Sequence, residues 1–418
     1  MPALRTARQL AWGLGLLAWL LSGCSSTSNR DALRGRIFLA IGASYSDRLS
    51  PTVIEERISQ VNQLIKGFQA LHPEVEAEIN VFREGDLQQA IARRNATGLG
   101  PDLIFLDGMT AHSLALAGMV RPMRFPRSTT EQIEPASFDR LRLKNGSFAG
   151  LPLLLEPQIA CFNRARLAQS PSSLQSLLEL AETGIEIGFS LESAGLYWTA
   201  GPLGAAPALK ALALGQPITQ AQHRQIRYWL KWIQTAQLLQ HINYYGPEED
   251  LVQGLMKGRL DWIPCHSNSL VRLRQALGKR LAVASLPGDF AGPATPITRE
   301  RVWAFGVNSS ANQRRIAEAF ATFTVNPLIQ RSLTISIQNQ LPVNRHVPPP
   351  VASSAVLGAM VTSEQQGQAS DEMVKLVPPL DQRRRQLAQL MMRLVFGEIS
   401  PDQATDALIK ELGDGAGR

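Results

Sequence analysis

Apolar residues in the first third of the chain follow two alternating spacings. A mostly apolar run over 36–41 ends at a glycine, which predicts a buried strand. Apolar residues three and four apart then line one face of a helix over 54–68. The alternation continues with a strand over 75–82, a helix over 86–94 and a strand over 101–107. Strands alternating with helices predict an α/β fold with a parallel, doubly wound sheet.

Polar residues stand where these strands end, which is where such sheets bind ligands. Ser44 and Asp47 follow the first strand, and Asp107 ends the third. They are candidate ligand contacts, although Ser and Asp at such positions also serve as turn and helix-cap residues. Further along, the extended run 150–163 carries Glu156 near its middle. That carboxylate needs a partner, because burying an unpaired charge is costly.

The N-terminus carries a separate apolar pattern. Arg5 and Arg8 precede an apolar run over 10–21, and the tetrapeptide Leu-Ser-Gly-Cys ending at Cys24 leads into a Ser-rich stretch. A charged start, a short apolar core and small residues before a cleavage point predict an export signal over 1–23. The apolar run is shorter than the about 20 residues that a membrane-spanning helix needs. The rest of the chain is therefore expected to work outside the cytoplasm.

Composition narrows the class of protein. The chain has 418 residues, 44% of them apolar and 18% charged, which is typical of a globular protein. Without the signal the chain is long enough for two substantial lobes. It has 42 basic and 35 acidic residues, but no basic block with interleaved aromatics and no nucleic-acid-binding motif. Solvated basic faces explain the net charge better than nucleic-acid binding does.

Two cysteines follow Cys24, and both lie in apolar, strand-like runs. Cys161 and Cys265 are expected as free buried thiols, because core cysteines behave as small hydrophobes. A disulfide stays the alternative, since the expected compartment is oxidising. The spacing of Cys and His residues predicts no metal site and no cofactor.

Several segments occur in an order that resembles a known family. The Leu-Ser-Gly-Cys tetrapeptide is similar to the bacterial lipobox, whose cysteine receives a diacylglycerol; the alternative is an ordinary signal peptide or an uncleaved anchor in which Cys24 is incidental. The other segments are Gly-Pro-Asp-Leu-Ile-Phe-Leu-Asp (100–107), Leu-Ala-Leu-Ala-Gly-Met-Val-Arg-Pro (114–122), Ser-Phe-Ala-Gly-Leu-Pro (147–152), Leu-Val-Gln-Gly-Leu-Met-Lys-Gly-Arg-Leu (251–260), Val-Trp-Ala-Phe-Gly-Val (302–307) and Phe-Gly-Glu-Ile-Ser-Pro-Asp-Gln-Ala (396–404). Together they resemble the bacterial extracellular solute-binding proteins (family 1) of ABC importers, the carbohydrate-binding group that includes the maltose-binding protein.

The resemblance implies a two-lobe periplasmic-binding-protein fold of type II. Each lobe is expected to hold a mostly parallel sheet flanked by helices, and hinge crossovers join the lobes around a cleft. The implied divisions are a lipoprotein signal peptide (1–23), a lipid-anchored linker (24–35), an N-terminal lobe (36–155 plus 288–341) and a C-terminal lobe (156–287 plus 342–418).

The resemblance also implies a function without catalysis. The chain would be a monomer, anchored by lipid through Cys24 in the periplasm or another extracytoplasmic space. It would capture a sugar or small glycoside and deliver it to ABC permease subunits in the membrane. The implied ligand-binding residues are polar groups of the first lobe and hinge together with aromatic platforms of the second lobe: Ser44, Asp47, Asp107, Glu156, Tyr197, Trp198 and Trp303.

The sequence departs from the family at places that bear on the ligand. Where sugar binders often have Gly-Pro-Trp, this chain has Pro264 followed by Cys-His-Ser-Asn, so His266 and Asn268 are expected to supply hydrogen bonds instead of a stacking ring. A charged Thr-Arg-Glu-Arg run over 298–301 replaces a glycine-rich approach. Arg384 leaves room for a partly anionic ligand. A small polar glycoside fits these features better than a long oligosaccharide.

Two other functions stay open from the sequence. Gly-Ala-Ser-Tyr-Ser-Asp over 42–47 looks like the nucleophile block of SGNH-like serine esterases, with Ser44 as nucleophile, but the chain contains no Asp-x-x-His to activate it. The other alternative is a lipoprotein that senses a solute without transporting it, since a fold does not fix a function.

Overall fold

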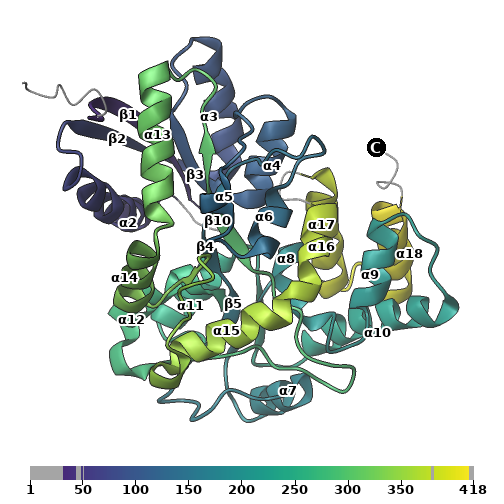
Figure 1. Cartoon of the computed structure of the whole chain (residues 1–418). Coiled ribbons are helices and arrows are strands. Elements are labelled where there is room, and N and C mark those ends of the chain that lie inside the picture. The colour runs from purple at the N-terminus through teal and green to yellow at the C-terminus, as the bar shows by residue number, and fades with distance from the viewer. Residues whose placement is uncertain (1–31, 44–48, 50, 378–380, 414–418) are drawn as a thin grey trace, which may run out of the picture.

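The structure, a computed structural model, describes residues 32–43, 49, 51–377 and 381–413. The predicted signal peptide, Cys24, Ser44 and Asp47 lie outside the described residues. Two sheets, each covered by helices, form two lobes that lie one above the other in Figure 1. Among the described residues, no helix is long and apolar enough to cross a membrane.

The first lobe is built around a sheet with the strand order β11-β4-β10-β3-β1-β2. β1 pairs in parallel with β2 and β3, whereas β10 runs antiparallel to β3 and β4. Its strands are β1 (Gly35–Ala43), β2 (Val75–Arg83), β3 (Leu103–Asp107), β4 (Leu151–Glu156), β10 (Arg299–Phe305) and β11 (Leu341–Pro342). The helices packed on or near it are α2 (Pro51–Gln69), α3 (Glu84–Ala96), α4 (Gly108–Leu116), α5 (Arg127–Thr130), α6 (Pro135–Leu141), α13 (Ala311–Thr324) and α14 (Pro327–Ile337).

The second lobe is built around a sheet with the strand order β7-β6-β8-β5-β9. β6 is parallel to β7 and β8, whereas β5 is antiparallel to β8 and β9. Its strands are β5 (Gln158–Asn163), β6 (Ile187–Ser190), β7 (Ile242–Tyr245), β8 (Trp262–His266) and β9 (Leu281–Ala284). Its helices are α7 (Leu174–Glu182), α8 (Ser193–Leu196), α9 (Ala206–Ala213), α10 (Gln220–Ala236), α11 (Glu248–Met256), α12 (Leu270–Leu277), α15 (Ala355–Gly367), α16 (Asp371–Leu376), α17 (Gln382–Val395) and α18 (Pro401–Gly413).

The sequence explains why these helices form where they do. Thr219 caps α10 with a capping box to Gln222, and the apolar face that follows, which includes Ile226 and Leu230, is buried. In the first lobe, Ser310 caps α13 in the same way. These caps fix the helix starts, while burial of the apolar stripe supplies most of the stability.

The two-lobe α/β architecture is as predicted, but the sheets are not. Both are mixed rather than mostly parallel, because strands near the lobe crossings run back against their neighbours. The predicted extended run 150–163 is two strands that belong to different sheets, broken at Pro157. Pro157 has no N–H to donate to either sheet, and the chain passes from the first lobe to the second at this residue. The chain returns between β9 and β10. The limits of the two lobes stay a prediction.

The expectation of free thiols is wrong. Cys161 and Cys265 form a disulfide between the neighbouring strands β5 and β8, and both residues are fully buried. Antiparallel neighbours bring their Cα atoms to 6.0 Å, a normal separation for a disulfide. Both cysteines are evident in the sequence, but the pairing of β5 with β8 that brings them together could not be predicted from it.

Candidate functional site

A cavity of about 320 Å³ lies where the two lobes meet. It lies beyond the carboxyl ends of β3, β6 and β8, where α/β sheets commonly bind ligands. Both lobes and the segments that connect them line the cavity. The first lobe contributes Asp107, Gly108, Met109, Arg140, Arg299 and Glu300. The second lobe and the connecting segments contribute Gln158, Ser190, Glu192, Gly195, Glu248, Pro264, His266, Ile297, Thr298, Asp371, Val374, Arg384, Arg385 and Ala388.

Glu248 organises one side of the cavity. It opens α11, directly after Pro247, and is buried. Its carboxylate accepts hydrogen bonds from the backbone N–H of His266 at 2.7 Å, from His266 Nδ1 at 2.8 Å and from Arg299 Nη2 at 2.7 Å. Burial alone would raise the pKa of Glu248, but Arg299 and His266 together hold it well below its usual range. Glu248 is therefore a carboxylate that links the second lobe to a strand of the first.

The same contacts fix how His266 faces the cavity. Because Nδ1 donates to Glu248, the other ring nitrogen, Nε2, is the one left for a ligand. Nε2 is buried and has no hydrogen-bond partner among the described residues, and His266 lines the cavity. Thr298 Oγ1 is likewise buried and unpartnered within the described part of the chain. Both atoms are therefore available for a solute to satisfy, as are buried side-chain atoms of Arg140 and Glu300 on the cavity wall.

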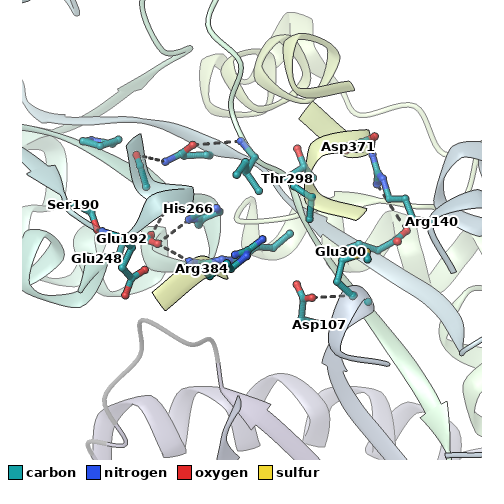
Figure 2. A pocket seen from close by; sticks show the side chains of 18 of the residues that line it. Asp107, Arg140, Ser190, Glu192, Glu248, His266, Thr298, Glu300, Asp371 and Arg384 are labelled. Atoms are coloured by element: carbon teal, nitrogen blue, oxygen red, sulfur yellow. Dashed lines mark hydrogen bonds and ion pairs between the residues drawn. The ribbon is translucent and has the colours of Figure 1, made fainter. Parts of the chain in front are cut away.

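A second charged cluster occupies the opposite side (Figure 2). Arg140 of α6 binds Asp371 of α16 with 2.5 Å between Nη2 and Oδ2, and its Nη1 lies 3.9 Å from Oε1 of Glu300. Burial raises the pKa of Glu300 to about 7, although Arg140 opposes that shift. Because Arg140 and Asp371 come from different lobes, this pair also spans the cleft.

Asp107 is held from behind by a buried ion pair. Its side chain caps α4 by accepting from Met109 N and Thr110 N, and its own N–H donates to Glu84 Oε1 at 2.7 Å. Glu84 pairs with Arg301 at 3.1 Å, and neither side chain is exposed. Burial raises the pKa of Glu84, while Arg301 opposes the shift. Asp107 is thus both a helix cap and part of the cavity wall.

The chemistry of the wall is polar and charged. Four arginines, five carboxylates and one imidazole line the cavity, and among its described residues there is no Phe, Tyr or Trp. The arginines donate forked hydrogen bonds and the carboxylates accept several each. No group of three or more His, Cys, Asp or Glu residues in the described part of the chain is placed to hold a metal. The site suits a solute with hydroxyl or charged groups on several sides.

Three of the residues predicted from the sequence meet in this cavity: Asp107, His266 and Arg384. Asn268 and Glu156 are buried but do not line it. Glu156 instead pairs with Arg57, with 3.4 Å between Oε1 and Nη1. This ion pair supplies the partner that a buried carboxylate was expected to need.

The expected aromatic platforms are core residues. Trp198 and Trp303 are fully buried, and the Trp303 indole N–H donates to Thr324 Oγ1 at 3.1 Å. Tyr197 is also buried, among apolar side chains of the second lobe. None of the three lines the cavity between the lobes. Tyr197 and Trp198 lie on a short 3-10 helix (Tyr197–Thr199), and Trp303 lies on β10. All three rings pack in apolar core clusters, and Tyr197 also lines the apolar hollow described below.

Most of the charged residues that line the cavity were not predicted from the sequence as ligand contacts. They are Arg140, Glu192, Glu248, Arg299, Glu300, Asp371 and Arg385. One signal was present. The Thr-Arg-Glu-Arg run stands at the start of a buried strand, and charges there require partners from elsewhere in the fold.

Comparison with solved structures shows the fold. The maltodextrin-binding protein MalE1 from L. casei BL23, solved without ligand, is 15% identical over 91% of this chain and 99% of that chain, with a TM-score of 0.68. The GacH receptor of Streptomyces glaucescens GLA.O, solved unliganded and with acarbose, is 14% identical over 91% and 99%, with a TM-score of 0.72. An ABC transporter solute-binding protein from Thermotoga lettingae TMO, bound with α-D-tagatose, is 16% identical over 91% and 100%, with a TM-score of 0.69.

Sequence comparisons add no closer relative: no family model matches the chain, and no curated protein sequence matches it. The chain therefore has the two-lobe α/β fold of ABC solute-binding proteins, at a sequence identity that leaves the ligand open.

Proposed function

We propose that this chain is the solute-binding component of an ABC importer and that its solute is a sugar or small glycoside. The observation that carries the proposal is the cavity between the lobes, where His266 Nε2 and Thr298 Oγ1 are buried without a partner among the described residues. A buried polar atom without a partner costs about 1–3 kcal/mol, which a hydroxyl-rich solute would recover.

The charged wall supports a polar solute of modest size. The cavity volume of about 320 Å³ lies at the low end of the range for small-molecule sites, about 300–1,000 Å³. Sugar hydroxyls donate to carboxylates such as Asp107 and accept from guanidinium groups such as Arg384. The similar structures include proteins described with acarbose and with α-D-tagatose, which agrees with a sugar class.

Capture and release require no chemical step. The pairs Glu248–Arg299 and Arg140–Asp371 join the lobes through side chains that also face the solute, so binding would favour a closed arrangement that a permease recognises. A diacylglycerol on Cys24 would hold this receptor at the membrane face, in the periplasm or another extracytoplasmic space. The predicted linker from Ser25 to about residue 35 would act as its tether.

A thermal-shift screen tests the proposal. Monosaccharides, disaccharides, glycosides, polyols and sugar phosphates are added to the folded chain without its signal peptide. A solute at 100 times its dissociation constant stabilises the bound form by about 2.7 kcal/mol, which raises the melting temperature measurably. The same solute should give a much smaller shift with Asp107→Ala, but an unchanged shift with Asp402→Asn, whose carboxylate pairs with Arg227 on the exposed surface. A panel without any hit would contradict the sugar class.

A further inference from the structure

A second, apolar hollow adjoins the charged cavity. Its volume is about 50 Å³, and its wall includes Trp229, Leu387, Met391, Leu408 and Leu412, all buried members of the core of the second lobe. These side chains come from α10, α17 and α18. The hollow therefore lies inside one lobe, next to the surface that faces the other.

The two spaces share part of their walls. Ile297, Val374 and Arg384 line both the charged cavity and the apolar hollow. Arg384 is held in place where its Nε donates to the backbone carbonyl of Val377 at 2.8 Å, and Val377 itself lines the hollow. A ligand bound in the charged cavity thus lies next to the hollow, whose remaining wall is apolar apart from the Tyr197 hydroxyl and the Trp229 indole N–H, which donates to Thr199.

The size of the hollow limits what enters it. A water molecule needs about 10–15 Å³ of such volume and two or more polar partners. Apart from Tyr197, Trp229 and Arg384, the residues that line the hollow are leucine, isoleucine, valine and methionine, which provide none. A hollow lined mainly by apolar side chains favours an apolar occupant. At about 10–15 Å³ for each water-sized group, about 50 Å³ holds roughly three to five such groups, which suits a short alkyl chain and is too little for a second sugar ring.

We propose that the hollow is a side pocket for an apolar substituent of the solute, such as the short alkyl aglycone of a glycoside. This inference rests on the proposed function for the polar half of the ligand, and it adds a specificity: an amphipathic glycoside binds more tightly than the bare sugar. Each methylene moved from water into the side pocket strengthens binding about fourfold. An n-butyl glycoside is therefore expected to bind roughly fifty-fold more tightly than its methyl counterpart.

Methionine methyl groups report on the side pocket directly. Met373 and Met391 line it, whereas Met360 is buried in a different core cluster and serves as an internal control. In protein labelled with ¹³C at the methionine methyls, n-butanol should shift the signals of Met373 and Met391 and leave that of Met360 unchanged. Calorimetric titrations with methyl and n-butyl β-D-glucopyranoside then measure the fold-change in affinity.

A variant that fills the side pocket provides the matched test. Leu412→Phe should abolish the n-butanol shifts, whereas Leu238→Phe, at a leucine that is 80% exposed, should leave them unchanged. The Met360 signal reports whether each variant is folded. Unperturbed Met373 and Met391 signals in n-butanol, or equal affinities for the two glucosides, would overturn the side pocket. The butanol arm contains no sugar, so its result is independent of the screen that decides whether the protein binds sugars.

Discussion

Glu248 is the residue whose replacement tests the cleft electrostatics most sharply. In Glu248→Gln the side chain keeps its shape but loses its charge, and its amide N–H groups meet the donors of His266 and Arg299. Removing one member of a buried ion pair typically costs about 3–5 kcal/mol. The Arg299 side chain is still 17% exposed, so we expect the lower end, a loss of about 3 kcal/mol in the free energy of unfolding.

The pH dependence of that loss follows from the lowered pKa of Glu248. A carboxyl whose pKa is depressed in the folded state contributes stability that is fully present above the unfolded-state pKa, near 4.3. The contribution is lost as the pH falls through the folded-state pKa. The difference between wild type and Glu248→Gln should therefore be constant from pH 7 to about 5 and should shrink below about pH 4.

Urea unfolding followed by tryptophan fluorescence, from pH 7 to pH 3, measures both effects. Asp402→Asn is the control, because it removes a carboxylate from an exposed ion pair with Arg227 and should cost less than about 1 kcal/mol. A Glu248→Gln loss as small as that of the control would refute the buried link between the lobes. A loss that is the same at pH 3 and at pH 7 would refute its electrostatic origin.

Three further predictions concern single contacts. Burial raises the pKa of Glu300 to about 7, so the stabilising contribution of its protonated form is present below pH 4.5 and is lost as the pH rises through 7. Between pH 5 and 8 the free energy of unfolding of Glu300→Gln should therefore rise relative to that of wild type by up to about 3 kcal/mol, measured in the same assay. Trp303→Phe loses the hydrogen bond to Thr324 and should lower the free energy of unfolding by about 1–2 kcal/mol. The sugar-induced thermal shift should stay the same, and its loss would show that Trp303 contacts the ligand. Replacing Cys161 and Cys265 by Ala together opens a cross-link between residues 104 apart and should cost up to about 5 kcal/mol. Two free thiols in addition to that of Cys24, titrated in wild type denatured without a reductant, would show that no disulfide had formed.

Periodicity predicted the five elements between residues 36 and 107 within a few residues, because each of these strands and helices carries its own apolar pattern. The expected strand over 75–82 is Val75–Arg83, and the expected helix over 54–68 is Pro51–Gln69. The sheet order and the antiparallel strands were not predictable, since they depend on pairings between distant segments.

The candidate site was less predictable than the fold, for a physical reason. A tryptophan that packs in a core and one that stacks on a sugar have the same local pattern, so Trp198 and Trp303 were misassigned. Conversely, Glu248 looks like an ordinary acidic helix start, and only the fold brings it to His266 and Arg299. Residues that act through long-range pairing leave little trace in a single sequence.

We expect one small sugar or glycoside to bind between the lobes, and isothermal titration of the folded chain measures that binding. The titration should give one site per chain, filled by a monosaccharide, disaccharide or short glycoside, with an affinity that falls in His266→Ala. Tight binding only to long glucans, or no heat of binding with any member of the panel, would contradict it.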